Sequence, residues 1–210
     1  MASTKVKICG LTSVEDAVIA VDAGADAIGL VFYADSPRCV SIEIAREIVR
    51  TVGPFTTTVG LFVNAAVSEL EQCVRETGVH VVQLHGDETP AYCRQMTTPY
   101  LRAIRVAPET DVAAAIAAYP AAAGYLMDAW HPERYGGTGE CFDWHRVAGM
   151  ASDPARVLIL AGGLSVDNIV EAVQSVRPYA VDVSSGVESA PGKKDPRLVR
   201  EFIARVRNVA

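Results

Sequence analysis

The sequence predicts an α/β fold in which a single (β/α)8 barrel spans residues 1–210. Eight short apolar runs alternate with amphipathic stretches, and no linker or shift in composition divides the chain. A repeat of about 26 residues suits a compact barrel. An open, doubly wound sheet is the alternative, but eight similar strands favour closure. No G-x-G-x-x-G motif of dinucleotide-binding folds follows the first strand.

The predicted strands are apolar almost throughout and often β-branched, as strands covered on both faces should be. They comprise residues 6–10, 27–32, 57–63, 79–85, 101–106, 125–130, 157–161 and 180–184.

The predicted helices carry capping signals, with Ser13 and Ser41 before the first two and Gly24 and Gly53 after them. Ser165 is expected to cap the seventh helix, so that its first N–H groups point towards the mouth of the barrel. After the sixth strand we expect only a short helix. The helical stretches are residues 13–24, 41–53, 67–78, 89–96, 111–119, 165–176 and 196–208.

Charge and cysteine content restrict the partners of this chain. Lys and Arg number 19 against 25 Asp and Glu, and the net charge of −6 argues against broad binding of nucleic acid or of an acidic membrane surface. We find no apolar segment of about 18–20 residues. The polar N-terminus does not resemble a signal peptide, so we expect a cytoplasmic protein. Five cysteines without a C-x-x-C motif disfavour a disulfide framework and a structural zinc site.

Polar residues near the ends of four predicted strands define the candidate site. Alternate residues of a barrel strand point inward, and barrel chemistry takes place at the carboxyl ends of the strands. The inward, polar positions are Cys9, Gln83, His85, Asp128 and Asp182, and we expect Gln83, His85 and Asp182 to bind substrate. Four titratable groups at one mouth indicate acid–base chemistry more readily than packing. A metal held by Cys9, His85 and Asp128 is conceivable, but no closely spaced ligand pair supports it, and we expect none.

Two glycine-containing turns predict a phosphate site. Gly162 and Gly163 follow the seventh strand, and Ser184, Ser185 and Gly186 follow the eighth. Loops at these two positions are the usual phosphate cradle of a (β/α)8 barrel.

The loop after the sixth strand is expected to act as a lid. Its 14 residues, 131–144, exceed the usual two to six of such a connection. Gly136, Gly137 and Gly139 surround Thr138 and suit a hinge. A disordered insertion is the alternative, which fits poorly with Phe142 and Trp144. Arg38, after the second strand, could bind a substrate carboxylate through two parallel hydrogen bonds.

Together these motifs resemble the phosphoribosylanthranilate isomerase family, in the same order from the first strand to the last helix. They are KICGLT (7–12), SPRCVS (36–41), GLFVN (60–64), VQLHGDE (82–88), GGTGECFDW (136–144), LAGGLSVDN (160–168) and VDVSSGVE (181–188).

The resemblance implies an Amadori rearrangement of N-(5-phosphoribosyl)anthranilate to 1-(2-carboxyphenylamino)-1-deoxyribulose 5-phosphate in tryptophan biosynthesis, without a cofactor. It implies that Cys9 is the general base, Asp128 the general acid and Arg38 the residue that binds the anthranilate carboxylate. Backbone amides around Gly163, Ser184, Ser185 and Gly186 would bind the phosphate, and we expect a monomer or homodimer.

Physical chemistry places opposite demands on the two catalytic groups. Asp128 must carry a proton, which a dry site and an anionic substrate favour, whereas the same charges oppose a thiolate at Cys9. Cys9 therefore needs N–H donors or a cation such as Lys7, or else a minor thiolate fraction carries the reaction.

Three other functions remain open at this point. A histidine-pathway or dual-substrate phosphoribosyl isomerase is the nearest, although that family has an aspartate where this chain has Cys9. A non-catalytic barrel that binds phosphometabolites would have no need of Cys9 and Asp128. An indole-forming barrel would need a lysine acid at the mouth.

Overall fold

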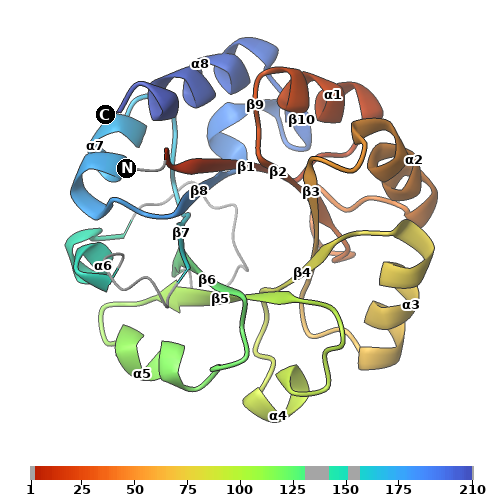
Figure 1. Ribbon diagram of the computed structural model, residues 1–210, viewed down its shortest axis with the longest axis horizontal. Helices are drawn as coiled ribbons and strands as arrows, with labels where there is room; N and C mark the ends of the chain where they lie inside the picture. Colours follow the sequence, from red (N-terminus) through yellow and green to blue (C-terminus); the bar gives the residue numbers. More distant parts are fainter. Residues whose placement is uncertain (1–2, 131–141, 151–156, 210) are drawn as a thin grey trace.

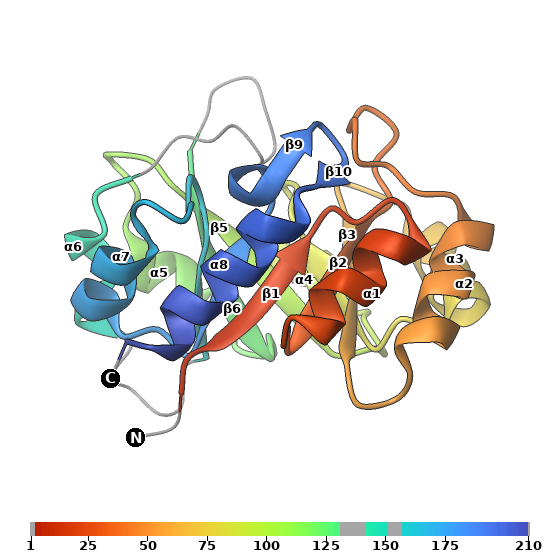
Figure 2. The ribbon, with the colours of Figure 1, turned by 90° about the horizontal axis from the view of Figure 1, so that it is seen from above.

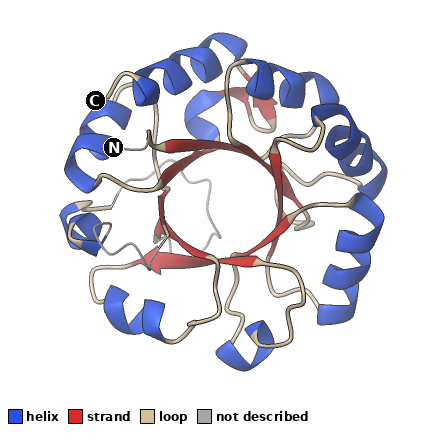
Figure 3. Ribbon diagram, viewed as in Figure 1, coloured by secondary structure: helices blue, strands red, loops and turns tan. Residues whose placement is uncertain are grey.

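Eight parallel strands close into a barrel in sequential order, β1 next to β2 and so on until β8 pairs with β1. The computed structural model describes residues 3–130, 142–150 and 157–209. The ring of strands lies inside and the helices lie outside it, as Figures 1 and 3 show. The strands are β1 (Lys5–Cys9), β2 (Ala27–Val31), β3 (Thr57–Phe62), β4 (Val81–Leu84), β5 (Tyr100–Val106), β6 (Gly124–Ala129), β7 (Leu158–Leu160) and β8 (Ala180–Val183).

The helices occupy the predicted stretches. They are α1 (Val14–Asp22), α2 (Ile42–Val52), α3 (Val67–Thr77), α4 (Pro90–Cys93), α5 (Val112–Ala117), α6 (His145–Ala148), α7 (Ile169–Val176) and α8 (Pro196–Arg207). Ser13 Oγ accepts from Asp16 N and Ser41 Oγ from Ile44 N, so both predicted N-caps are confirmed. The fold class is confirmed as well, and strand ends shift by no more than two residues.

The prediction that Ser165 caps the seventh helix is wrong. Helix α7 begins at Ile169 after Asn168, and no side chain caps it. Asn168 Oδ1 accepts from Ser165 N, and Asn168 Nδ2 donates to Gly163 O. This asparagine closes a local turn that competes with an earlier helix start.

A small hairpin, which the sequence patterns did not predict, follows β8. A 3-10 turn, η2 (Ser185–Val187), leads into β9 (Glu188–Ala190), which pairs antiparallel with β10 (Lys193–Lys194). Figure 2 shows this hairpin at the end of the barrel away from the chain termini. That end carries the carboxyl ends of the strands, so the hairpin reaches the candidate site.

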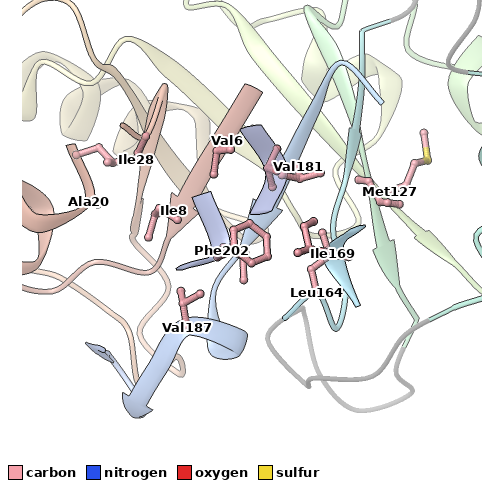
Figure 4. Packing of buried hydrophobic residues seen from close by; sticks show 14 of the residues in the cluster. Val6, Ile8, Ala20, Ile28, Met127, Leu164, Ile169, Val181, Val187 and Phe202 are labelled. Atoms are coloured by element: carbon pink, nitrogen blue, oxygen red, sulfur yellow. The ribbon is translucent and has the colours of Figure 1, made fainter. Parts of the chain in front are cut away.

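Two apolar layers orient the strand side chains. Figure 4 shows Val6, Ile8 and Val181 directed towards Phe202 of α8, in the layer between barrel and helices. Inside the barrel a separate cluster includes Leu126 and Ile159. Because Val6 and Ile8 face outward, the alternation of β1 turns Lys7 and Cys9 inward. Among the described residues, no helix is both long and apolar enough to cross a membrane.

Candidate active site

A cavity at the carboxyl ends of the strands gathers most of the predicted site residues. The cavity opens to solvent and has both polar and apolar residues in its wall, as small-molecule sites do. The predicted residues lining it are Cys9, Arg38, Gln83, His85, Asp128, Gly162, Gly163, Asp182, Ser184 and Ser185. Gly186 lies beside this cavity rather than in its wall, and the predicted lid residues Gly136, Gly137, Thr138 and Gly139 lie outside the described residues. Phe142 and Trp144 pack against the core, as expected.

Cys9 ends β1 and presents a buried thiol to the cavity, with 5% of the residue exposed. Gly29 on β2 makes room for it, since a Cβ there would lie 2.6 Å from the sulfur. Burial raises the pKa of the thiol, and the charge of Lys7 opposes this increase. The net pKa is higher than usual, so Cys9 is protonated at neutral pH before substrate binds.

Lys7 lies one layer deeper in the barrel, and sequence analysis named it only as a possible cation for Cys9. Its ammonium donates to Asp182 Oδ1 and to Gln83 Oε1, each at 2.9 Å. Burial alone would lower the pKa of Lys7, but the negative charge of Asp182 and the hydrogen bond to it raise the pKa above the ordinary value. Lys7 is therefore a fixed positive charge beneath the thiol.

Asp128 and His85 form the opposite wall of the same polar network. Asp128 ends β6, where its Oδ1 accepts from Ala129 N at 2.9 Å and its Oδ2 lies 3.0 Å from His85 Nε2. His85 Nδ1 lies 2.9 Å from Gln83 Nε2. Only about 5% of Asp128 is exposed, so substrate that fills the cavity would meet a carboxyl group shielded from water.

A buried ion pair holds the turn that carries His85. Glu88 accepts from Gly86 N, and Arg102 donates to Glu88 Oε2 at 2.6 Å. Arg102 also donates to Leu84 O and Gly86 O on either side of His85. These contacts fix the backbone from which the histidine projects.

Arg38 reaches the cavity with one edge of its guanidinium already occupied. Its Nε and Nη2 donate to the two carboxylate oxygens of Glu188 at 2.8 and 2.7 Å. Lys194, almost fully buried, donates to the same carboxylate at 2.7 Å. Burial would raise the pKa of Glu188, but these two cations hold it below the ordinary value. Sequence analysis missed Glu188 and Lys194, although Glu188 closes the VDVSSGVE motif.

Close packing explains the glycines in the turns after β7 and β8. Gly162 has φ +78°, and a Cβ there would lie 2.4 Å from Ala129 N and 3.0 Å from Asp128 Oδ1. A Cβ at Gly186 would lie 1.9 Å from Leu164 O. The turns after β7 and β8 therefore touch backbone to backbone, which only glycine permits.

Fold and cavity together define a (β/α)8-barrel enzyme that performs acid–base chemistry on a small anionic substrate. A thiol and a carboxyl group face one cavity, an arginine lies at its mouth, and glycine- and serine-containing turns line one side. In the described ranges, no three His, Cys, Asp or Glu side chains are placed to hold a metal ion.

Comparison with known proteins identifies the particular family. The model of the N-(5'-phosphoribosyl)anthranilate isomerase family matches residues 6–205. The chain is 51% identical to N-(5'-phosphoribosyl)anthranilate isomerase of Stutzerimonas stutzeri over 209 residues, which cover 100% of both chains. The chain belongs to the N-(5'-phosphoribosyl)anthranilate isomerase family.

Solved structures agree with this assignment. Monomers generated from the dimeric phosphoribosylanthranilate isomerase of Thermotoga maritima superpose with a TM-score of 0.85 at 37% identity, covering 97% of this chain and 98% of theirs. A phosphoribosyl anthranilate isomerase in complex with reduced 1-(o-carboxyphenylamino)-1-deoxyribulose 5-phosphate gives a TM-score of 0.86 at 38% identity, with the same coverage.

Proposed function

We propose that this chain isomerises N-(5'-phosphoribosyl)anthranilate to 1-(2-carboxyphenylamino)-1-deoxyribulose 5-phosphate, a step of tryptophan biosynthesis, with Cys9 as general base and Asp128 as general acid. The observation that carries the assignment of roles is the placement of these two buried groups in one cavity. They come from β1 and β6, and β7 and β8 lie between these strands on one side of the barrel. Base and acid can therefore approach one sugar ring from different directions.

The reaction needs one proton donated and one removed. Asp128 donates a proton to the furanose ring oxygen while the bond from that oxygen to C1 breaks, and the anthranilate nitrogen supplies the electron pair that forms the Schiff base. The thiolate form of Cys9, a minor fraction that Lys7 and Lys194 favour, then removes the proton from C2, and the electrons of that bond neutralise the Schiff base to give an enolamine. The enol tautomerises to the ketose product. The step is an internal redox change, so no outside oxidant or reductant enters.

The residues around the two catalytic groups match the charges of this substrate. The Nη1–Nη2 edge of the Arg38 guanidinium, adjacent to the Nε–Nη2 edge that binds Glu188, can donate to the anthranilate carboxylate. Gly163, Ser184 and Ser185 line the side of the cavity to which we assign the phosphate. Gln83 and Asp182 take part in substrate binding mainly through Lys7, to which both are hydrogen bonded. That ammonium and Lys194 each favour the thiolate form of Cys9.

Two substitutions test the assigned roles. We expect Cys9→Ala and Asp128→Asn each to lower kcat by about 10²–10⁴-fold, the usual contribution of a general base or acid. The assay mixes purified protein with freshly made phosphoribosylanthranilate and follows the loss of anthranilate-type fluorescence. Near-normal turnover by both folded variants would refute the assignment. Parallel assay with the histidine-pathway aminoimidazole substrate distinguishes a dual-substrate enzyme.

We further propose that the chain forms a homodimer through the amino-terminal end of its barrel. The Thermotoga maritima relative is described as dimeric. At this end Phe55, which precedes β3, is fully exposed, and a hollow lined largely by apolar residues, including Val81 and Leu101, lies inside the ring. A second copy that covered both would remove this apolar surface from water. Light scattering after gel filtration tests it, and a monomer at micromolar concentration would contradict it.

A further inference from the structure

Four polar side chains form a continuous line across the interior of the barrel, from Lys7 on β1 to Asp128 on β6. Lys7 Nζ lies 2.9 Å from Gln83 Oε1, Gln83 Nε2 lies 2.9 Å from His85 Nδ1, and His85 Nε2 lies 3.0 Å from Asp128 Oδ2. All four residues are buried, and Gln83 is completely inaccessible. Water therefore does not compete for these hydrogen bonds.

Chemistry fixes the direction of every bond in this line. A lysine ammonium only donates, so the Gln83 atom beside it must be the amide oxygen. The other end of that amide is an NH2 group, which also only donates, so His85 Nδ1 must accept and carries no proton. A neutral imidazole then has its proton on Nε2, where it donates to Asp128 Oδ2.

The same logic disfavours a doubly protonated His85. An imidazolium would place an N–H at Nδ1 against the NH2 group of Gln83, and Lys7 prevents the amide from turning over. Among the described residues, the other charged groups near the ring do not contact Nδ1. Asp128 contacts Nε2, while Cys9, Asp182 and Arg38 line other parts of the cavity.

We propose that Lys7 and Gln83 hold His85 as the Nε2–H tautomer, and that His85 thereby positions the carboxyl group of Asp128 for its role as acid. The Nε2–H of His85 holds Oδ2 of Asp128 and the backbone N–H of Ala129 holds Oδ1, so both oxygens of the carboxyl group are fixed in place. Lys7, Gln83 and His85 are positioning residues in this scheme. The proposal rests on the role of Asp128 as acid proposed above.

Nitrogen NMR of the wild-type protein tests the tautomer directly. The chain has four histidines, and the signals of His85 are those lost from a 15N-histidine sample of His85→Gln. At about pH 8, where an ordinary imidazole is neutral, we expect a pyridine-type Nδ1 and a pyrrole-type Nε2. A pyrrole-type Nδ1 overturns the proposal.

The variant Gln83→Glu tests the consequence for catalysis. One carboxylate oxygen can still pair with Lys7, but the other now accepts from Nδ1–H and stabilises the imidazolium. We expect a protonated Nδ1 in the spectrum, kcat at least tenfold lower, KM within about threefold of wild type and an altered pH profile of kcat. Gln95→Glu, the same change at an exposed position on the surface, should leave spectrum and kinetics unchanged.

The outcomes separate this inference from the proposed function. If the Gln83→Glu protein shows the imidazolium of His85 in its spectrum but keeps the wild-type kcat and pH profile, the hydrogen-bonded line from Lys7 to Asp128 has only a structural role, and the inference is overturned. Full activity of Asp128→Asn overturns the proposed role of the acid instead, whatever the tautomer of His85.

Discussion

The buried pair of Lys7 and Asp182 allows a quantitative test of how the barrel interior is held together. Nζ and Oδ1 lie 2.9 Å apart, and the two side chains are 5% and 9% exposed. Lys7→Met keeps most of the side-chain volume but leaves the Asp182 carboxylate without its cation and Gln83 Oε1 without its donor. Breaking a buried pair in this way costs about 3–5 kcal/mol, a large part of the roughly 5–15 kcal/mol that stabilises a typical domain.

Urea unfolding followed by circular dichroism measures this cost. With a slope of roughly 2 kcal/mol per molar urea, the midpoint of Lys7→Met should fall by about 2 M. The double variant Lys7→Met with Asp182→Leu should recover much of the lost stability, because replacing both residues by apolar ones leaves no unpaired charge in the barrel. Lys5→Met is the matched control, since its pair with Asp26 is partly exposed and is worth at most about 1 kcal/mol. A Lys7→Met protein as stable as this control would refute the reasoning.

Four further predictions concern the cavity and the turn beside it. Arg38→Ala should raise KM at least tenfold with little change in kcat, and an unchanged KM would exclude Arg38 as the residue that binds the substrate carboxylate. Glu188→Gln should raise KM less, because the guanidinium of Arg38 then loses its carboxylate partner but keeps its charge. The pKa of Glu188 is lowered in the fold, so its ionised form stabilises the protein above the ordinary carboxyl range, and this contribution is lost as pH falls through the lowered pKa. Glu188→Gln should therefore be less stable than wild type at neutral pH but differ little from it in strong acid. Thermal melts over a pH series measure this difference. Because the pKa of Cys9 is raised, the rate of its alkylation by iodoacetamide, measured by peptide mass spectrometry, should still increase above the pH at which an ordinary thiol is ionised; a plateau near pH 8 would contradict this. Gly186→Ala should raise KM, because the added methyl group displaces Leu164 O; normal affinity for phosphate would contradict this.

The repeat of apolar runs along the sequence predicted both the barrel and the burial of its strands. Runs such as residues 27–32 and 157–161 have no polar face, so both of their faces must be covered, and eight such runs close on themselves. Alternation along β1 and β4 was sufficient to turn Cys9 and His85 inward, because side-chain direction in a strand depends only on local geometry. Ser165 failed as a cap because Asn168, three residues later, offered the backbone a competing turn.

The sequence by itself determined which residues meet at the mouth of the barrel, since strand order and alternation are properties of neighbours in the chain. Only the tertiary structure decided what those residues do to each other. Glu188 and Lys194 come from a short hairpin with no periodic signal. Glu188 binds Arg38, 150 positions away in the sequence, and Lys194 binds Glu188. The pairing of Lys7 with Asp182 joins residues 175 positions apart. Charges and hydrogen bonds act through space at a few ångströms, and no local pattern records which distant groups the closed barrel brings within that distance.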